Sequence, residues 1–281
     1  MNVPEFLRRK RISLDRKFLL FIKYILQGLG VRGRTNGKQV ILVAGVQRSG
    51  TNMMMEVLER SYDTCVFNDW DSRAFENYEL RSPDVIHFLV EGAAPGHVVF
   101  KVLLDLQYLE KIMSEYNPVK VLWIVRDYRD VVNSHLMKWR NMTNILGAIL
   151  DGDGSAGWRG RDVPESLLQE VGRYYHSTIS ESSACALFWY FRNYLFFEQG
   201  LDKDPRVRVV SYEELVSHPA YMSSEIFEFL GLQYSPRVSE KVFSTSVKKQ
   251  PPPDIEPDIE MLCSSLMKRF LESECVVDRP S

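Results

Sequence analysis

The sequence predicts an α/β protein in which a central parallel sheet of about five strands is flanked by helices in three layers. Short apolar runs recur along the 281 residues, and stretches with the apolar spacing of helices separate them. This alternation is typical of a parallel sheet that is covered on both faces. At residues 45–52 the first apolar run continues through a polar, glycine-bounded loop into a helix, which is a common site for an anion.

The predicted strands are apolar runs that end at glycine, proline or polar residues. Such runs are typical of parallel strands that are buried on both faces. Lys101 lies inside one of them, where a lysine is costly unless it is paired or functional. We expect the strands at residues 40–45, 65–67, 98–103, 119–125 and 207–212.

Apolar residues at helical spacing predict the helices that connect these strands. The helix at 182–198 is rich in aromatic residues with few basic residues between them, so we interpret it as core and not as a nucleic-acid platform. We expect helices at residues 53–58, 84–91, 106–116, 131–139, 182–198, 213–232 and 259–271.

One domain at residues 39–281 is expected, after a basic, amphipathic helical segment at 1–38. The 35 Lys and Arg residues against 37 Asp and Glu give a net charge of −2, so the bulk charge does not favour nucleic acid as a partner. The four cysteines are widely spaced, which predicts reduced thiols. A stretch near 151–163 predicts a mobile loop, in which Ala156 stands where a calcium loop needs glycine.

Residues 8–31 join the basic run Arg8–Arg11 to an apolar run. The apolar run is shorter than the roughly 18 to 20 residues of a spanning helix, and Lys23 interrupts it. An amphipathic helix fits better, either packed on the domain, which we favour slightly, or lying on an anionic membrane. We therefore expect a cytoplasmic protein, with peripheral membrane contact through residues 8–31 or a Golgi-type membrane anchor as alternatives.

The loop at 45–52 has the glycine spacing of the phosphate-loop signature G-x-x-x-x-G-K-[ST]. Thr51 occupies the position of its lysine, and Asn52 that of its magnesium-binding hydroxyl. Both differences argue against a magnesium-dependent triphosphatase or kinase. Arg48 can still form a forked pair with an oxyanion, so the loop predicts phosphate binding without a metal.

Charged residues also follow other predicted strands, at the edge where ligands bind in α/β sheets. Asp69 and Asp71 follow the second strand, and Arg126 ends the fourth. We expect these side chains to lie near the loop.

With these residues in view, the chain resembles the sulfotransferase family that uses 3′-phosphoadenosine 5′-phosphosulfate (PAPS) as donor. The segment Gln47–Thr51 is similar to its loop for the 5′-phosphosulfate, and Val125–Asp130 with Ser134 is similar to its 3′-phosphate motif. Val209–Leu215 and Phe229–Leu232 are similar to two later motifs. The resemblance covers about residues 39–271 and implies a three-layer P-loop NTPase-like fold.

The resemblance also implies a role for each matching residue. Lys101 and Arg48 would stabilise charge on the leaving phosphate oxygen, with no metal required. The donor would be bound by Gln47, Arg48, Ser49, Gly50, Thr51 and Asn52 at its 5′ end, by Arg126 and Ser134 at its 3′-phosphate, and by Tyr212 at the adenine.

A carboxylate is the expected base. The cytosolic small-molecule branch of the family places a histidine where this chain has Leu103, whereas carbohydrate and tyrosylprotein branches commonly use a carboxylate after the second strand. We prefer Asp69 slightly over its rivals Asp71 and Glu76. The chain also departs from the family at Asn52 and at Tyr128, where proline is usual.

The acceptor is expected to be a hydroxyl or amine on a small molecule, carbohydrate, lipid or peptide. Two other functions stay open, namely a divergent nucleotide kinase and a catalytically inactive, membrane-associated scaffold. Candidates to line the acceptor pocket are Trp70, Phe75, Tyr78, Trp139 and Trp158.

Overall fold

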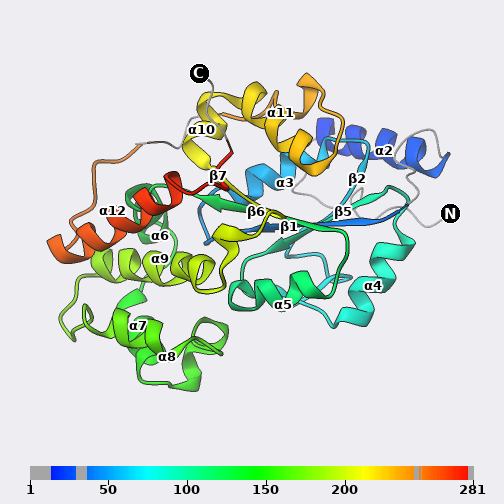
Figure 1. The fold of residues 1–281 in the computed structure, drawn as a ribbon. Coiled ribbons are helices and arrows are strands. Elements are labelled where there is room, and N and C mark those ends of the chain that lie inside the picture. The colour runs from blue at the N-terminus through cyan, green and yellow to red at the C-terminus, as the bar shows by residue number, and fades with distance from the viewer. Residues whose placement is uncertain (1–13, 30–36, 244–246, 248, 278–281) are drawn as a thin grey trace.

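The computed structural model describes residues 14–29, 37–243, 247 and 249–277 (Figure 1). Its centre is a five-stranded parallel sheet with the strand order β2-β5-β1-β6-β7. The predicted α/β class and the central sheet are therefore confirmed. In chain order the strands are β1 Gln39–Ala44, β2 Thr64–Phe67, β5 His97–Val102, β6 Val119–Val125 and β7 Val207–Ser211.

Successive residues of β1 point to opposite faces of the sheet and into two separate cores. Ile41 and Val43 pack with residues of three helices on one face, which are α3 (Thr51–Glu59), α10 (Tyr212–Ser217) and α11 (Pro219–Leu230). Figure 1 shows these helices above the sheet, and α4, α5 and α9 below it.

The opposite core contains the alternate residues Val40, Leu42 and Ala44. Each fully buried large apolar side chain contributes about 1.5–3 kcal/mol, so the two cores hold the sheet rigidly between its helices. The helices of this face are α4 Pro83–Gly92, the 3₁₀ turn Leu106–Tyr108, α5 Leu109–Ser114, α6 Tyr128–Leu136, α9 Glu181–Glu198 and α12 Pro257–Leu271.

Helix bounds differ from the predicted ones where local side chains decide them. Helix α6 begins at Tyr128 because the Asp127 carboxylate accepts a hydrogen bond from the Arg129 amide, as an N-cap does. Pro219 begins a second helix, so the predicted helix at 213–232 is divided into α10 and α11.

The region between α6 and α9 contains helices that the sequence did not predict. They are α7 (Met142–Leu150), a 3₁₀ helix η2 (Gly154–Arg159) and α8 (Glu165–Gly172). Helix η2 lies inside the stretch predicted as a loop, with Gly157 at φ 60°. Mobility of that stretch stays a prediction. A small antiparallel hairpin, β3 Phe75–Glu76 and β4 Glu79–Leu80, is also new.

The N-terminal helix α2 (Leu14–Gly28) packs on the edge of the domain through polar groups (Figure 1). The buried ammonium of Lys23 donates to the Glu59 carbonyl at 2.8 Å and to Thr64 Oγ1 at 3.0 Å. Arg16 forms an ion pair with Glu59 at 2.6 Å. None of the helices in the described ranges has the length and hydropathy to cross a bilayer. The basic run Arg8–Arg11 lies outside the described residues.

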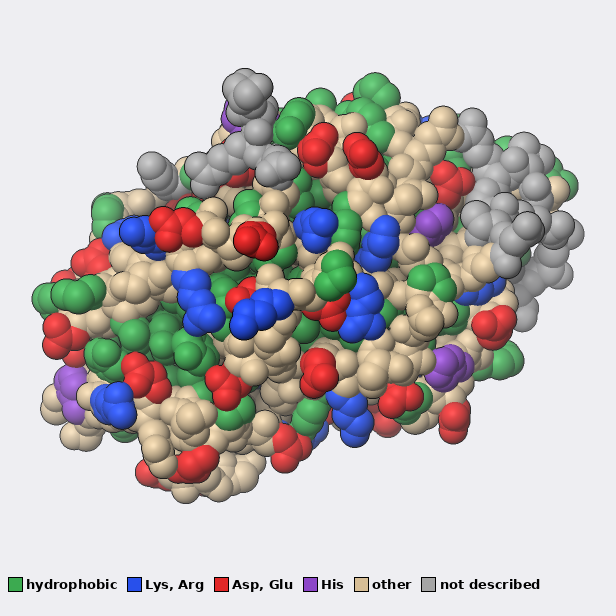
Figure 2. All heavy atoms as spheres, in the orientation of Figure 1, with side chains coloured by type: hydrophobic (Ala, Val, Ile, Leu, Met, Phe, Trp, Pro, Cys, Tyr) green, Lys and Arg blue, Asp and Glu red, His purple; other side chains and the backbone are tan. Residues whose placement is uncertain are grey.

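Lys and Arg side chains are interspersed with Asp and Glu on the face of the molecule in Figure 2. This mixed surface agrees with the small net charge of −2.

Candidate active site

The loop between β1 and α3 turns sharply, and its glycines make that turn possible. Gly45 has a φ of 144° and Gly50 a φ of 99°, both in the region that L side chains rarely adopt. A Cβ on Gly50 would lie 2.2 Å from Cδ2 of Tyr212, so this position has room only for glycine. Gly50 is the N-cap of α3 and contributes no side-chain cap, which leaves the first amides of the helix to a ligand.

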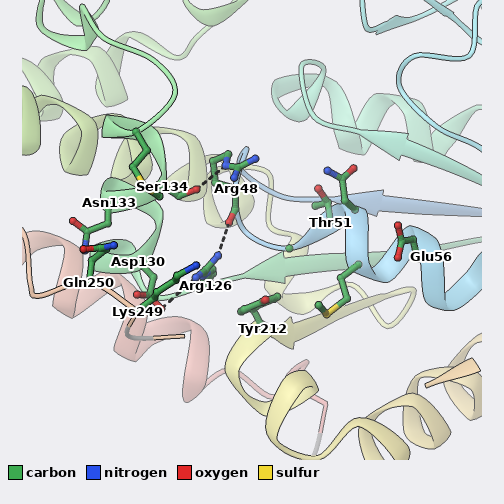
Figure 3. A pocket seen from close by; sticks show the side chains of 14 residues that line it. Arg48, Thr51, Glu56, Arg126, Asp130, Asn133, Ser134, Tyr212, Lys249 and Gln250 are labelled. Carbon is green, nitrogen blue, oxygen red and sulfur yellow. Dashed lines mark hydrogen bonds and ion pairs between the residues drawn. The ribbon is translucent and has the colours of Figure 1, made fainter. Parts of the chain in front are cut away.

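A cavity of about 410 Å³ lies in front of these amides (Figure 3). The carboxyl ends of β1, β6 and β7 meet there, so residues far apart in the chain share its wall. The residues that line it are Arg48, Gly50, Thr51, Asn52, Met53, Glu56, Arg126, Asp130, Asn133, Ser134, Met137, Tyr212, Lys249 and Gln250.

Direct hydrogen bonds join the cationic residues of this cavity. Arg48 Nε donates to Ser134 Oγ at 2.8 Å, and Arg126 Nη1 donates to the Arg48 carbonyl at 3.3 Å. The Arg126 guanidinium lies 4.5 Å from the centre of the Tyr212 ring. The structure therefore brings Arg48, Arg126, Ser134 and Tyr212 together around one cavity.

Two guanidiniums in one partly buried cavity favour an anion. Burial lowers the pKa of Arg48, and the positive charge of Arg126 lowers that pKa further. An oxyanion bound between Arg48 and Arg126 would relieve this repulsion with charge-assisted hydrogen bonds.

Asp130, Lys249 and Gln250 are among the lining residues that were not predicted as site residues. Asp130 pairs with Arg126 at 3.3 Å, a contact that the i, i+4 spacing on the sequence could have indicated. Lys249 and Gln250 enter from the segment before α12, and Figure 3 shows them on the side of Asp130. No local pattern marks such a distant segment as part of the site.

Lys101 and Asp69 form a buried ion pair beside the loop. Lys101 Nζ lies 2.9 Å from Asp69 Oδ2 and 2.8 Å from Asn52 Oδ1. Burial lowers the Lys101 pKa, the Asp69 carboxylate opposes this shift, and the Arg48 charge adds to it. Arg48 thus lies within electrostatic reach of both Arg126 and Lys101.

The two other acids proposed as a base lie elsewhere. The buried Asp71 carboxylate binds the Arg73 guanidinium at 2.6 Å and also accepts a hydrogen bond from the Arg73 amide, so it stabilises a turn. Glu76 is exposed on the β3–β4 hairpin. Of the three acids, only Asp69 lines a cavity described here.

A second cavity of about 540 Å³ adjoins the first and shares Arg48, Thr51 and Asn52 with it. Trp70 is exposed and Phe75 is in the core, so neither of these candidates lines it. Aromatic side chains form much of the wall, namely Tyr78, Trp139, Trp158 and Phe188, and the polar part of the wall includes Gln47, Asp69, Lys101, His135, Arg140 and Arg159.

His135 is a titratable residue of this wall that sequence reasoning missed. Its Nε2 lies 3.4 Å from the Gln47 carbonyl, and its ring packs 4.9 Å from that of Trp139. Burial, with the charges of Arg48 and Arg159, lowers the His135 pKa to about 4. The imidazole is therefore neutral at physiological pH and a weak base.

The fold and the two cavities define an α/β protein of the phosphate-loop class, in which a cationic cavity adjoins an aromatic one. Residues 38–251 match the family described as Sulfotransferase domain. The chain therefore belongs to the sulfotransferase family and is an enzyme of that class.

The chain is also similar to solved structures, at low sequence identity. A sulfotransferase domain from the curacin biosynthetic pathway is 13% identical, with a TM-score of 0.52 over 83% of this chain and 99% of that one. The sulfotransferase from Alicyclobacillus acidocaldarius is 17% identical, with a TM-score of 0.45 over 85% and 92%. Mouse sulfotransferase SULT7A1, in complex with PAP, is 15% identical, with a TM-score of 0.41 over 86% and 72%. No curated protein matched the chain.

Proposed function

We propose that the enzyme transfers a sulfuryl group from PAPS to a hydroxyl or amine acceptor, without a metal. The supporting observation is the row of cations Arg126, Arg48 and Lys101 along two cavities that share a wall. PAPS carries two anionic groups, one at each end of its ribose. A site that binds only one anionic group would not need a second group of cations.

The residues of the first cavity fit the two phosphates of the donor. The amides at the start of α3 and the loop residues 47–52 receive the 5′-phosphosulfate, since the helix dipole favours negative charge there. Arg126 and Ser134 receive the 3′-phosphate, with Lys249 as a second cation beside Arg126. Tyr212 contacts the nucleotide from the side of Gly50 and Arg126.

The second cavity holds the acceptor next to the transferred group. The acceptor oxygen or nitrogen forms a bond to sulfur as the bond from sulfur to the phosphate oxygen breaks, and the released electron pair stays on that oxygen. Lys101 and Arg48 stabilise the developing negative charge. Asp69 accepts the acceptor proton, so the products are the sulfated acceptor and 3′-phosphoadenosine 5′-phosphate (PAP).

Arginine and lysine supply the positive charge that magnesium supplies to phosphate-loop kinases. Asn52 offers an amide where those enzymes have the hydroxyl that binds the metal. Its Oδ1 accepts a hydrogen bond from Lys101, so this residue orients a cation of the protein.

Replacing Arg126 with alanine is expected to weaken PAP binding about 10- to 150-fold, because charge-assisted hydrogen bonds to the 3′-phosphate contribute about 1.5–3 kcal/mol. Adenosine 5′-phosphate lacks that group, so its affinity should change less than about threefold. Calorimetry with both nucleotides measures the difference. Arg129→Ala is the matched control, since Arg129 pairs with Glu260 away from the cavity. Equal losses for both nucleotides would reject the assignment of Arg126.

Helix α2 is the basis of a further proposal, contact with an anionic membrane surface. Its polar side chains face the domain, while Phe18, Phe21, Ile25 and Leu29 point outward, with Phe18 68% and Leu29 71% exposed. An outward apolar stripe next to the basic run Arg8–Arg11 is typical of helices that lie in the headgroup layer.

Cosedimentation with phosphatidylcholine vesicles, with and without phosphatidylserine, tests this contact. We expect binding to the anionic vesicles only, weakened by salt. The double variant F18S/I25S should bind more than about tenfold more weakly, because each buried apolar side chain contributes about 1.5–3 kcal/mol. Met261→Ser is the control, because Met261 is an exposed apolar residue of α12, away from α2 in the sequence. The contact would be disproved if F18S/I25S bound the vesicles as tightly as the wild type, or if the wild type did not bind anionic vesicles.

A further inference from the structure

Arg159 is a half-buried cation in the wall of the second cavity. Burial lowers its pKa, and no carboxylate among the residues that the structure describes raises it. Within the part of the chain that the structure describes, its guanidinium has no hydrogen bond or ion pair, and it lies 4.5 Å from the centre of the Trp158 ring. Arg48 and Lys101 differ from Arg159 in this respect, since Arg48 binds Ser134 and Lys101 binds Asp69.

A partly desolvated guanidinium without an anion is costly. The Trp158 ring offsets part of this cost, because cation–π contacts contribute about 0.5–2 kcal/mol. The indole gives the guanidinium no acceptor for its N–H groups, which makes Arg159 a candidate for ligand binding.

The charged side chains that line the second cavity sum to a positive charge. Among the described lining residues, Asp69 is the one carboxylate, and Lys101 neutralises it. Arg140 lines the same cavity and is exposed at its mouth. Arg140 and Arg159 therefore leave the acceptor side with positive charge that no described acid balances.

We propose that the acceptor carries an oxyanion, such as a carboxylate, and that Arg159 binds it. This inference rests on the proposed function, because it takes the second cavity as the acceptor site. The walls formed by Trp139, Trp158 and Phe188 suit a flat, apolar body between the oxyanion and the reacting hydroxyl. Holding the acceptor at one end orients its other end toward Asp69 and Lys101.

Calorimetry on the PAP-saturated enzyme tests this proposal with a matched pair, 4-hydroxybenzoate and its methyl ester. The wild type should bind the acid at least about tenfold more tightly than the ester, as expected for a hydrogen bond to a charged group. Arg159→Gln should remove this preference, with the affinity for the ester unchanged, and Arg159→Lys should keep part of it. The control Arg173→Gln should behave as wild type, since Arg173 is exposed at the C-cap of α8 and pairs with Glu170.

Each possible result either supports or overturns the role of Arg159 in acceptor binding. Equal affinities of the wild type for acid and ester, no binding of the acid, or a preference that persists in Arg159→Gln would overturn the role of Arg159. A separate titration with PAP distinguishes failure of the role of Arg159 from failure of the donor assignment. An enzyme that binds PAP but does not discriminate between acid and ester keeps its proposed function and loses only this inference.

Discussion

Replacing Lys101 with alanine is expected to lower kcat about 100- to 1,000-fold while the affinity for PAP changes less than about threefold. The reason is that Lys101 lines the second cavity and binds Asn52, which lines both cavities, so it would stabilise charge that develops only in the transition state. The rate of transfer is measured with labelled donor and an acceptor found in a screen of acceptor classes. The affinity for PAP is measured by calorimetry.

Lys120→Ala is the matched control for this variant. Lys120 also lies in a parallel strand, but it donates to the Phe229 carbonyl on the side of α11. Its loss should leave the transfer rate near that of the wild type. A Lys101→Ala enzyme that keeps the wild-type rate would remove Lys101 from the mechanism, and one that loses PAP binding equally would make it a residue of ground-state binding.

The variant Asp69→Asn should lose about 100- to 10,000-fold in kcat, the usual contribution of a general base. Asparagine keeps the shape and a hydrogen-bond acceptor for Lys101 but takes no proton at neutral pH. The loss should be smaller for acceptors with more acidic hydroxyls, because they need less help in losing a proton. Transfer rates for a series of acceptors of graded acidity measure this dependence.

Glu76→Gln is the control, since this exposed acid lines neither cavity. Its rate should equal that of the wild type. Thermal melting must show that Asp69→Asn is folded, because Lys101 is buried and loses its ion pair. A folded Asp69→Asn enzyme with more than a tenth of the wild-type rate, together with a slow Glu76→Gln enzyme, would move the base to Glu76.

The strands could be predicted within one or two residues because buried parallel strands are continuous apolar runs. For example, the run 119–125 is β6 as predicted. Helix ends were less predictable, since a single side chain such as Asp127 decides where α6 begins. The helices between 142 and 172 were missed, because short helices depend on packing against α9 more than on their own pattern.

The residues of the site also fall into those that the sequence predicts and those that it does not. Arg48 and Arg126 follow buried strands, so the sequence alone placed them at one edge of the sheet. His135, Arg159 and Lys249 carry no such signal, because folding brings them to the cavities from α6, from η2 and from the segment before α12, respectively. That Arg159 has no hydrogen-bond or ion-pair partner among the described residues can be seen only in three dimensions.

Binding of PAP in the presence of EDTA tests the central claim most directly, since it requires both phosphate subsites and no metal. Calorimetry should give one site per chain with a Kd of about 1 μM or tighter, about 8 kcal/mol of binding free energy. Adenosine 5′-phosphate should bind at least about tenfold more weakly, because it cannot contact Arg126 through a 3′-phosphate. Absence of PAP binding, or turnover of ATP with magnesium, would contradict the account.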